Sequence, residues 1–208
     1  MRKGMNRYFS AVLFSAALFS FACGRQTFDN PNLVEVRSIN PNIQLDIRYA
    51  TDSNFTHQRL YSVAKCYLRK EAAESLSAVQ KELEKMGLGL KVFDGYRPLS
   101  IQKKMWKIFP DDRYVANPAT GSRHNRGAAV DVTLVDSLGH ELEMPTGFDD
   151  FTDRAHRDYN NLPKNEIQDR KFLQEVMERH GFVGLSTEWW HFDLKDWKKY
   201  PIVDIPIK

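Results

Sequence analysis

Cysteine is scarce in this sequence: Cys23 and Cys66 are the only two among 208 residues. A scaffold held together by several disulfides is therefore excluded, and an apolar core must stabilise the fold. A single Cys23–Cys66 bridge stays open if the chain is exported and Cys23 is unmodified. Otherwise we expect Cys66 to be a small buried thiol, because lone cysteines are usually packing residues. The chain is long enough for one domain with a sizeable core.

Long apolar runs are also rare, and the one that stands out lies at the N-terminus. The uncharged stretch over residues 8–22 follows the basic residues Arg2, Lys3 and Arg7. It is too short to cross a bilayer comfortably, so it predicts a signal peptide over residues 1–22 rather than a membrane helix.

Cys23 directly follows Ser20-Phe21-Ala22, which has the small-x-small form of a cleavage site. Together with Gly24 it resembles a bacterial lipoprotein junction, where the cysteine becomes lipid-modified. We therefore expect an exported, periplasmic protein, attached to the membrane only through a lipid on Cys23 if that junction is used. A polar tether over residues 23–32 then leads to a folded domain over residues 33–208.

The mature chain has no excess charge of either sign. Removing the three basic residues of the signal segment from 30 leaves 27 basic residues against 27 acidic ones. No basic patch interleaved with aromatic residues is present either, so nucleic acid is excluded as a partner. Nothing in the sequence indicates an oligomeric state.

No internal repeat, low-complexity tract or shift in composition divides residues 33–208, which favours one domain. Alternating apolar residues predict strands at 43–49, 88–92, 128–134 and 190–194. Apolar spacings of three and four predict helices at 69–86, 101–108 and 167–180. Without strict alternation of strand and helix, this order predicts an α+β domain with a mainly antiparallel sheet flanked by helices.

Chemical groups concentrate in two short stretches, and the first is Ser122-Arg123-His124-Asn125-Arg126-Gly127-Ala128-Ala129-Val130-Asp131. Gly127 permits a sharp bend between His124 and the strand that carries Asp131. An unpaired carboxylate in an apolar strand is costly, so Asp131 needs a partner. A metal ion shared with His124 would supply one. The alternative is a buried Asp131 bonded to backbone amides, with His124 at the surface.

The second stretch is Glu188-Trp189-Trp190-His191. The aromatic residues are typical of a strand, in which residues three apart point to opposite faces. Glu188 is therefore expected in the turn before the strand, and the flexible run over residues 184–187 makes that easy. The helical zinc motif His-Glu-x-x-His is absent. The alternative interpretation is a surface Glu188 and a His191 packed by aromatic residues.

Together, Ser-x-His-x-x-Gly-x-Ala-x-Asp and Glu-x-Trp-His resemble the D-alanyl-D-alanine metallopeptidases, and most closely the VanX-type D-Ala-D-Ala dipeptidases. Further segments resemble the family in the same order: Asp46-Ile47-Arg48-Tyr49-Ala50-Thr51 with Asn54-Phe55, Asp94-Gly95-Tyr96-Arg97-Pro98, and Gly147-Phe148-Asp149. The resemblance covers roughly the whole of residues 33–208. It implies an α+β fold with the metal site on the sheet and one Zn²⁺ per chain, held by His124, Asp131 and His191. Glu188 would be the catalytic base.

The same resemblance implies roles for four more residues. Arg97 would stabilise the transition state, because a guanidinium stays charged and donates two hydrogen bonds to an oxyanion. Tyr49, Ser122 and Asp149 would receive the free ammonium of the substrate, a group with three hydrogen-bond donors. Asp150, directly beside Asp149, is a competing candidate.

The implied activity is hydrolysis of a small D,D-dipeptide by metal-activated water. Two alternatives stay open: a D,D-carboxypeptidase that acts on longer peptidoglycan peptides, and a non-catalytic lipoprotein that binds the cell wall. The remaining histidines have no spacing typical of ligands and are interpreted as surface or structural residues. The exception is His156, whose segment resembles the family and which could brace the site.

Overall fold

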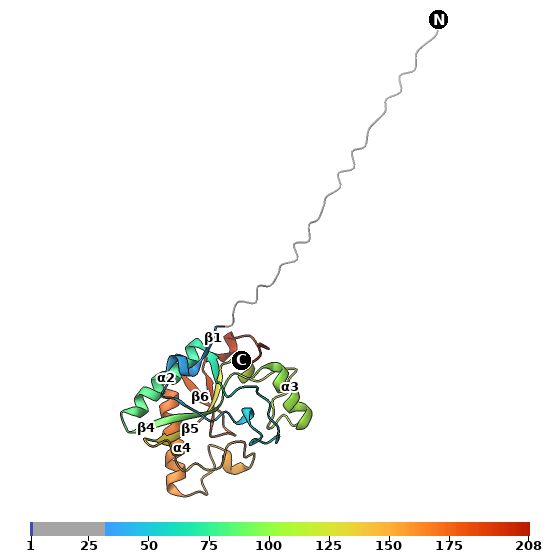
Figure 1. The fold of residues 1–208 in the computed structure, drawn as a ribbon. Coiled ribbons are helices and arrows are strands. Elements are labelled where there is room, and N and C mark those ends of the chain that lie inside the picture. Colours follow the sequence, from blue (N-terminus) through green and yellow to red (C-terminus); the bar gives the residue numbers. More distant parts are fainter. Residues whose placement is uncertain (2–31) are drawn as a thin grey trace.

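The computed structural model describes Met1 and residues 32–208 (Figure 1). The predicted signal peptide over residues 1–22, Cys23 and nearly all of the predicted tether over residues 23–32 lie outside the described residues. The first strand begins at Leu33, where the sequence predicts the folded domain to begin.

A five-stranded sheet with the order β2-β4-β5-β7-β6 forms the centre of the domain. Its strands are β2 (Gln44–Leu45), β4 (Leu88–Asp94), β5 (Ala129–Asp136), β6 (Phe182–Gly184) and β7 (His191–Leu194). The β2–β4 pair is parallel, and the other neighbours in this sheet are antiparallel. A separate antiparallel pair joins β1 (Leu33–Glu35) to β3 (Tyr67–Arg69). The predicted α+β fold with a mainly antiparallel sheet is confirmed.

The long helices α2 (Lys70–Glu84) and α4 (Lys164–Arg179) pack on the sheet and on each other. Figure 1 shows them together on one side of the domain, with α3 (Leu99–Ile108) on the other side. The short helix α1 (Val36–Ile39) follows β1 and contacts α2. None of the helices in the described part of the chain combines the length and apolar character needed to cross a bilayer.

The central strand β5 is buried on both faces. Val130, Val132 and Leu134 are fully buried, and Asp131 between them is 3% exposed. Because neighbouring residues of a strand point to opposite faces, the apolar set packs on one side of the sheet and Asp131 faces the other. The predicted alternation in this strand is therefore confirmed.

The predicted strand over residues 43–49 is wrong in most of its length. Only Gln44–Leu45 pairs with β4, and the chain then turns into a 3₁₀ helix, η1 (Arg48–Ala50). Tyr49 and Ile47 are buried by this turn rather than by the pleat of a strand. β2 lies at the edge of the sheet and pairs with β4 alone. The turn brings Tyr49 to the site described below.

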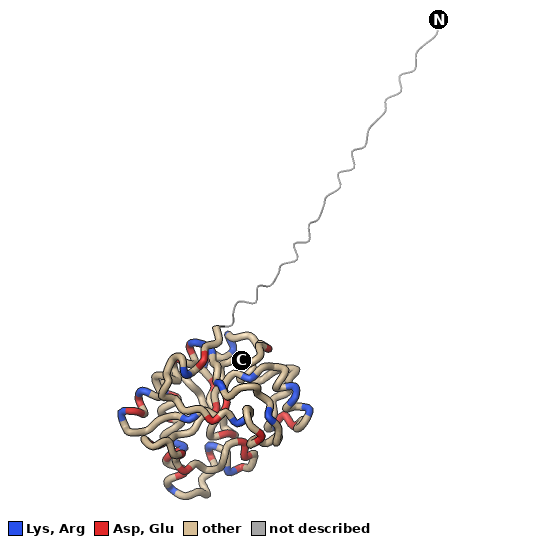
Figure 2. Tube along the Cα trace, in the orientation of Figure 1, with Lys and Arg blue, Asp and Glu red and all other residues tan. Residues whose placement is uncertain are grey.

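Charged residues of both signs are interspersed over the outer helices and loops (Figure 2). The single described cysteine, Cys66, is a buried thiol, and burial raises its pKa well above the usual value. This agrees with its interpretation as a packing residue.

Candidate metal centre

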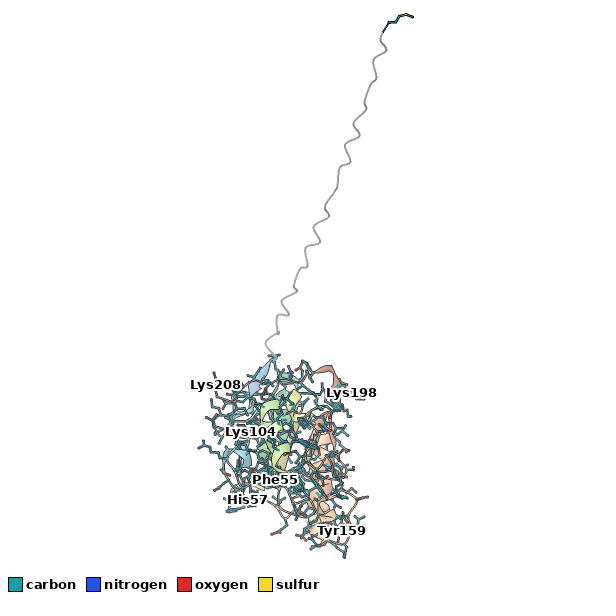
Figure 3. The ribbon with its side chains drawn as sticks, turned by 90° about the vertical axis from the view of Figure 1, so that its right-hand side faces the viewer. Phe55, His57, Lys104, Tyr159, Lys198 and Lys208 are labelled. Atoms are coloured by element: carbon teal, nitrogen blue, oxygen red, sulfur yellow. The ribbon has the colours of Figure 1, made fainter. Side chains whose placement is uncertain are left out.

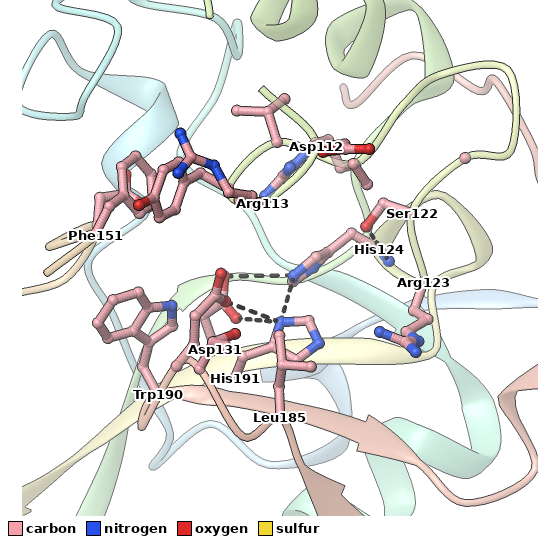
Figure 4. Close-up of a pocket in the computed structure, with 18 of the residues that line it drawn as sticks. Asp112, Arg113, Ser122, Arg123, His124, Asp131, Phe151, Leu185, Trp190 and His191 are labelled. Carbon is pink, nitrogen blue, oxygen red and sulfur yellow. Dashed lines mark hydrogen bonds and ion pairs between the residues drawn. The ribbon is translucent and has the colours of Figure 1, made fainter. Parts of the chain in front are cut away.

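One cavity of about 450 Å³ brings together the eight residues that the sequence singles out (Figure 4). They come from segments between residues 49 and 191 of the chain: Tyr49, Arg97, Ser122, His124, Asp131, Asp149, Glu188 and His191. The cavity lies on the face of the sheet to which Asp131 points.

The pairing of β5 with β7 sets two of the metal-ligand candidates side by side. Asp131 and His191 are direct partners in the antiparallel register. His124 comes from the 3₁₀ helix η2 (His124–Arg126), which ends at Gly127 with φ +68°. A side chain at Gly127 would approach Leu33 to 2.5 Å, so glycine suits both the left-handed backbone and the close contact. The predicted bend at Gly127 is confirmed.

The three candidate ligands meet at donor-atom distances that suit a tetrahedral metal. His124 Nε2 lies 3.1 Å from His191 Nδ1 and 3.4 Å from Asp131 Oδ2, and His191 Nδ1 lies 3.0 Å from Asp131 Oδ1. Metal–ligand bonds of about 2.0–2.2 Å in a tetrahedron separate the ligand atoms by about 3.3–3.6 Å. Among the described residues, this is the group of His, Cys, Asp or Glu that could hold an ion.

In both imidazoles, the ring nitrogen that points away from the ligand group forms a hydrogen bond. His124 Nδ1 donates to the Gly95 carbonyl at 2.8 Å, and His191 Nε2 donates to Asp193 at 3.0 Å. In the neutral rings, the inward nitrogens are then both hydrogen-bond acceptors. They face each other and a carboxylate, so three acceptors converge on a position that a metal ion or a proton could occupy. Such outer hydrogen bonds orient the histidines of metal sites.

Without a metal, a proton on His191 fills that place. Burial opposes the charged ring, but hydrogen bonds to Asp131 and Asp193 outweigh it and raise the pKa of His191 to about 10. Burial likewise opposes ionisation of Asp131, yet the two neighbouring imidazoles hold the pKa of this carboxyl below its usual value. A metal ion and a proton therefore compete for the same nitrogen.

Glu188 lies in the turn between β6 and β7, where the sequence predicts it. Its Oε2 is 3.8 Å from His191 Nδ1, so it lies beside the ligand group without belonging to it. Burial raises the pKa of Glu188. A carboxylate at this distance can accept a proton from a water molecule on the metal position.

Arg157 holds the turn that carries Glu188, and the sequence gives no sign of this role. Its Nε donates to the Leu185 carbonyl at 2.8 Å and its Nη2 to the His191 carbonyl at 2.9 Å. His156, interpreted above as a brace, does not line the cavity. The side chain that braces the turn is that of Arg157, the residue after His156.

Arg97 is buried, and its position is set by two side chains. Nε and Nη2 donate to Asp94 Oδ2 at 3.1 and 2.7 Å, and Nη1 donates to Gln102 at 3.0 Å. Burial opposes the charge of Arg97, but Asp94 outweighs it and the pKa lies well above the usual value. A guanidinium has five N–H bonds, so two remain for a ligand in the cavity.

Asp94 reaches this position because β4 contains a bulge. The register with β5 shifts between Val92 and Asp94, which leaves Phe93 as an extra residue and sets Asp94 opposite Asp131. Bulges re-aim side chains in this way. Without the shift, Phe93 would lie opposite Asp131. Asp94 belongs to the Asp94–Pro98 segment recognised in the sequence, but its partnership with Arg97 was not predicted.

Tyr49 and Asp149 form a pair at the cavity wall. The Tyr49 hydroxyl donates to the Asp149 carboxylate, with both oxygens at 3.1 Å. Burial, followed by the charge of Asp131, raises the pKa of Asp149 well above its usual value. The neighbour Asp150 does not line the cavity, and its carboxylate accepts from the Thr152 backbone. Asp149 is therefore the better placed of the two acids.

Ser122 lines the same cavity but occupies a different part of it. Its hydroxyl accepts a hydrogen bond from the backbone N–H of His124 at 3.2 Å. Figure 4 places Ser122 beside His124 and Arg123, across the ligand group from Phe151. None of the hydrogen bonds found in the described chain joins Ser122 to Tyr49 or Asp149.

Aromatic rings from three segments form one wall of the cavity. Phe151 packs against Phe55 at 5.4 Å and against Tyr114 at 4.8 Å between ring centroids. Phe109, at the end of α3, contacts all three rings. Figure 3, seen from the side of α3, shows Phe55 below Lys104 of that helix. Because Phe151 follows Asp149 by two residues, this wall lies on the side of the loop that carries Asp149.

Known proteins resemble this chain over most of its length. A solved structure of the LdcB LD-carboxypeptidase matches with a TM-score of 0.44 and 24% identity, over 62% of this chain and 61% of that chain. D-alanyl-D-alanine dipeptidases of Escherichia coli (strain K12) and Enterococcus faecium are more similar in sequence. They are 37% and 33% identical over 84% and 80% of this chain, and over 91% and 93% of their own lengths. The peptidase family M15 model, described as D-Ala-D-Ala dipeptidase, matches residues 29–205, so this chain belongs to the D-Ala-D-Ala dipeptidase family of peptidases.

Proposed function

We propose that this enzyme hydrolyses the D-alanyl-D-alanine dipeptide with one Zn²⁺ held by His124, Asp131 and His191. The observation that carries the proposal is the convergence of three acceptor atoms beside a spare carboxylate, Glu188. Three protein ligands leave a fourth position open, as catalytic zinc requires. The names of the curated relatives supply the substrate class.

Zn²⁺, when bound, acts as a Lewis acid that makes water more acidic and polarises the scissile carbonyl. The protein residues then move the protons. Glu188 takes the proton from the attacking water and later delivers it to the leaving amine. Its raised pKa suits both steps, because a carboxyl that is too acidic would not hold the proton between them.

Arg97 would stabilise the negative charge that develops on the carbonyl oxygen. Asp94 and Gln102 fix the guanidinium before substrate arrives, so its two remaining N–H bonds need no reorganisation. The free ammonium of the substrate would bind Asp149 and Tyr49. Burial disfavours the ionised Asp149, and an ammonium partner would remove that penalty.

Two other functions remain as competing proposals. A D,D-carboxypeptidase would trim longer peptidoglycan peptides with the same metal residues. A wall-binding lipoprotein would keep the fold without turnover. The aromatic wall beside Asp149 favours a substrate that ends at its ammonium, which supports the dipeptidase over the carboxypeptidase. Export to the periplasm, with or without a lipid on Cys23, completes the proposal and rests on the sequence alone.

Substrate comparison tests the proposal directly. The zinc-loaded domain is expected to release D-Ala from free D-Ala-D-Ala and to leave L,L-dipeptides and an N-acetylated D-Ala-D-Ala intact. Asp149→Asn is expected to lower kcat/KM for the free dipeptide about 10- to 100-fold, because it removes a charged partner of the ammonium. Asp150→Asn is the matched control and should leave kcat/KM for the free dipeptide unchanged. Preferential cleavage of the blocked peptide would favour the carboxypeptidase, and a zinc-loaded protein inert on every peptide would favour the binding protein.

Zinc binding is expected to release a proton near neutral pH. The pKa of His191 is about 10 in the metal-free protein, so its ring is protonated below that pH and must lose the proton to coordinate. Apparent zinc affinity should therefore rise about tenfold per pH unit between roughly pH 7 and 9. Titration calorimetry in buffers of different ionisation enthalpy measures the released proton. A binding enthalpy that is independent of the buffer at pH 7.5 would contradict this assignment.

A further inference from the structure

Arg123 lies on the cavity wall, and two neighbours hold its side chain there. Its Nε is 3.3 Å from Asp193 Oδ2, and its guanidinium carbon lies 5.0 Å from the centre of the Trp197 ring. The side chain is 39% exposed and lines the cavity. Asp193 in turn accepts from His191, so Arg123 lies directly beside the metal centre.

The outer end of this guanidinium is available. The ion pair with Asp193 uses Nε, and none of the contacts found in the described chain uses Nη1 or Nη2 for a hydrogen bond. These two nitrogens form a fork that matches the two oxygens of a carboxylate. Because Trp197 and Asp193 already restrict the side chain, a ligand would find the fork in place.

The cavity therefore carries opposite charges on its two sides. Asp149 follows Phe148, which packs on Trp190 with ring centroids 5.5 Å apart. Figure 4 shows Trp190 and Arg123 on opposite sides of the ligand group formed by His124, Asp131 and His191. A free dipeptide is a zwitterion whose two residues span at most about 7 Å. Its ammonium and carboxylate must lie on opposite sides of the scissile carbonyl.

We propose that Arg123 binds the C-terminal carboxylate of the substrate and makes the enzyme specific for peptides with a free C-terminus. This rests on the proposed dipeptidase function and adds to it the second charged end of the substrate. Recognition at both ends then restricts the site to zwitterionic dipeptides.

The other arginines of the cavity are less suited to this role. Arg97 is bound by Asp94 and Gln102 on the side of Tyr49, over whose ring it lies at 5.0 Å. Arg126 donates to the Tyr200 carbonyl. Arg113 is paired with Asp111, and its side chain is 72% exposed. Arg123 alone among these four combines a fixed position beside the metal ligands with an uncommitted fork.

Binding to a Glu188→Gln protein, which is expected not to turn over, tests the proposal. Calorimetry would measure the affinities for D-Ala-D-Ala and for its C-terminal amide. Both would be measured in the Glu188→Gln protein and in the double variant that also carries Arg123→Gln. We expect Arg123→Gln to weaken binding of the free acid about 10- to 100-fold and binding of the amide less than about threefold. Arg123→Lys keeps the charge and the pairing with Asp193 but loses the fork. Its affinity for the free acid should therefore lie between those of the proteins with Arg123 and with Arg123→Gln. Arg179→Gln is the matched control, because Arg179 pairs with Glu82 outside the cavity, and it should leave the binding of both ligands unchanged.

Zinc content and melting temperature of each protein separate the possible failures. Equal losses for the acid and the amide at full zinc occupancy would overturn the proposal and assign Arg123 to support of Asp193 instead. Unchanged binding of the acid would overturn it as well. If the Glu188→Gln protein with intact Arg123 binds neither ligand, the proposed dipeptidase function fails, and the carboxylate assignment fails with it.

Discussion

Glu188→Gln is expected to lower kcat for D-Ala-D-Ala by about 100- to 10,000-fold, the range over which general acid–base catalysis acts. Glutamine keeps the size of the side chain but cannot take the proton from water. The turn should survive, because Arg157 holds it through the backbone carbonyls of Leu185 and His191 rather than through the Glu188 side chain. Zinc affinity should change little, since Glu188 lies outside the three-ligand group.

The measurement is a rate of D-Ala release at matched zinc occupancy, checked by metal analysis. Glu141→Gln provides a control, because Glu141 is a carboxylate on the protein surface that pairs with Lys91. Its rate should equal that of the unmodified protein. If Glu188→Gln with bound zinc turns over within threefold of the parent, another group must activate the water.

His191→Ala is expected to abolish zinc binding and turnover together. The substitution removes a ligand and leaves Asp131 buried without its closest partner, which lies 3.0 Å away. Asp193→Ala should cost about 10- to 100-fold in zinc affinity, as is usual when the partner that orients a metal-bound histidine is lost. The loss in His191→Ala should be larger, so the two variants form a graded series.

Competition with a chelator of known zinc affinity measures both variants. His140→Ala is the matched control, because His140 is an exposed histidine that pairs with Asp136 through an ordinary surface contact. Zinc should raise the melting temperature of the parent protein and of this control, because a ligand that binds only the folded state stabilises it. Full zinc affinity in His191→Ala would show that the metal binds elsewhere.

The candidate ligand set came from the family resemblance, because the chemistry of His124 and Asp131 alone also allows a metal-free arrangement. An acid in an apolar strand needs a partner, and the alternation of residues 128–134 alone assigns Asp131 to the face opposite the apolar set. The position of Glu188 in a turn follows from the aromatic strand residues after it. The structure brings these residues into one cavity with Arg97, Tyr49, Ser122 and Asp149.

The supporting residues depend on pairings that local sequence does not reveal. Asp94 faces the site only because of the bulge at Phe93, and the position of a bulge is decided by the partner strand. Arg157 acts on carbonyls of a turn 28 and 34 residues further along the chain. Asp193 could have been found, because it lies two residues after His191 and so shares its face in a strand.

Tyr49 lies in the cavity although the sequence predicts the wrong element for it. The sequence alternates as a strand around it, yet the chain leaves the edge of the sheet after Leu45 and turns. Burial inside a turn produced the same apolar pattern as burial under a sheet. Periodicity over so short a stretch does not distinguish the two.

The candidate metal ligands lie far apart along the chain, so we expect them to meet late in folding. Asp131 and His191 are 60 residues apart, and His124 and His191 are 67 residues apart. Contacts at such separations require closure of long loops and are slow to form. We therefore expect a metal held by these residues to bind late in folding, once β5 and β7 have paired. An interaction that is absent from the transition state slows unfolding and leaves the folding rate almost unchanged. The metal would then determine how long a folded molecule survives, as well as what it catalyses.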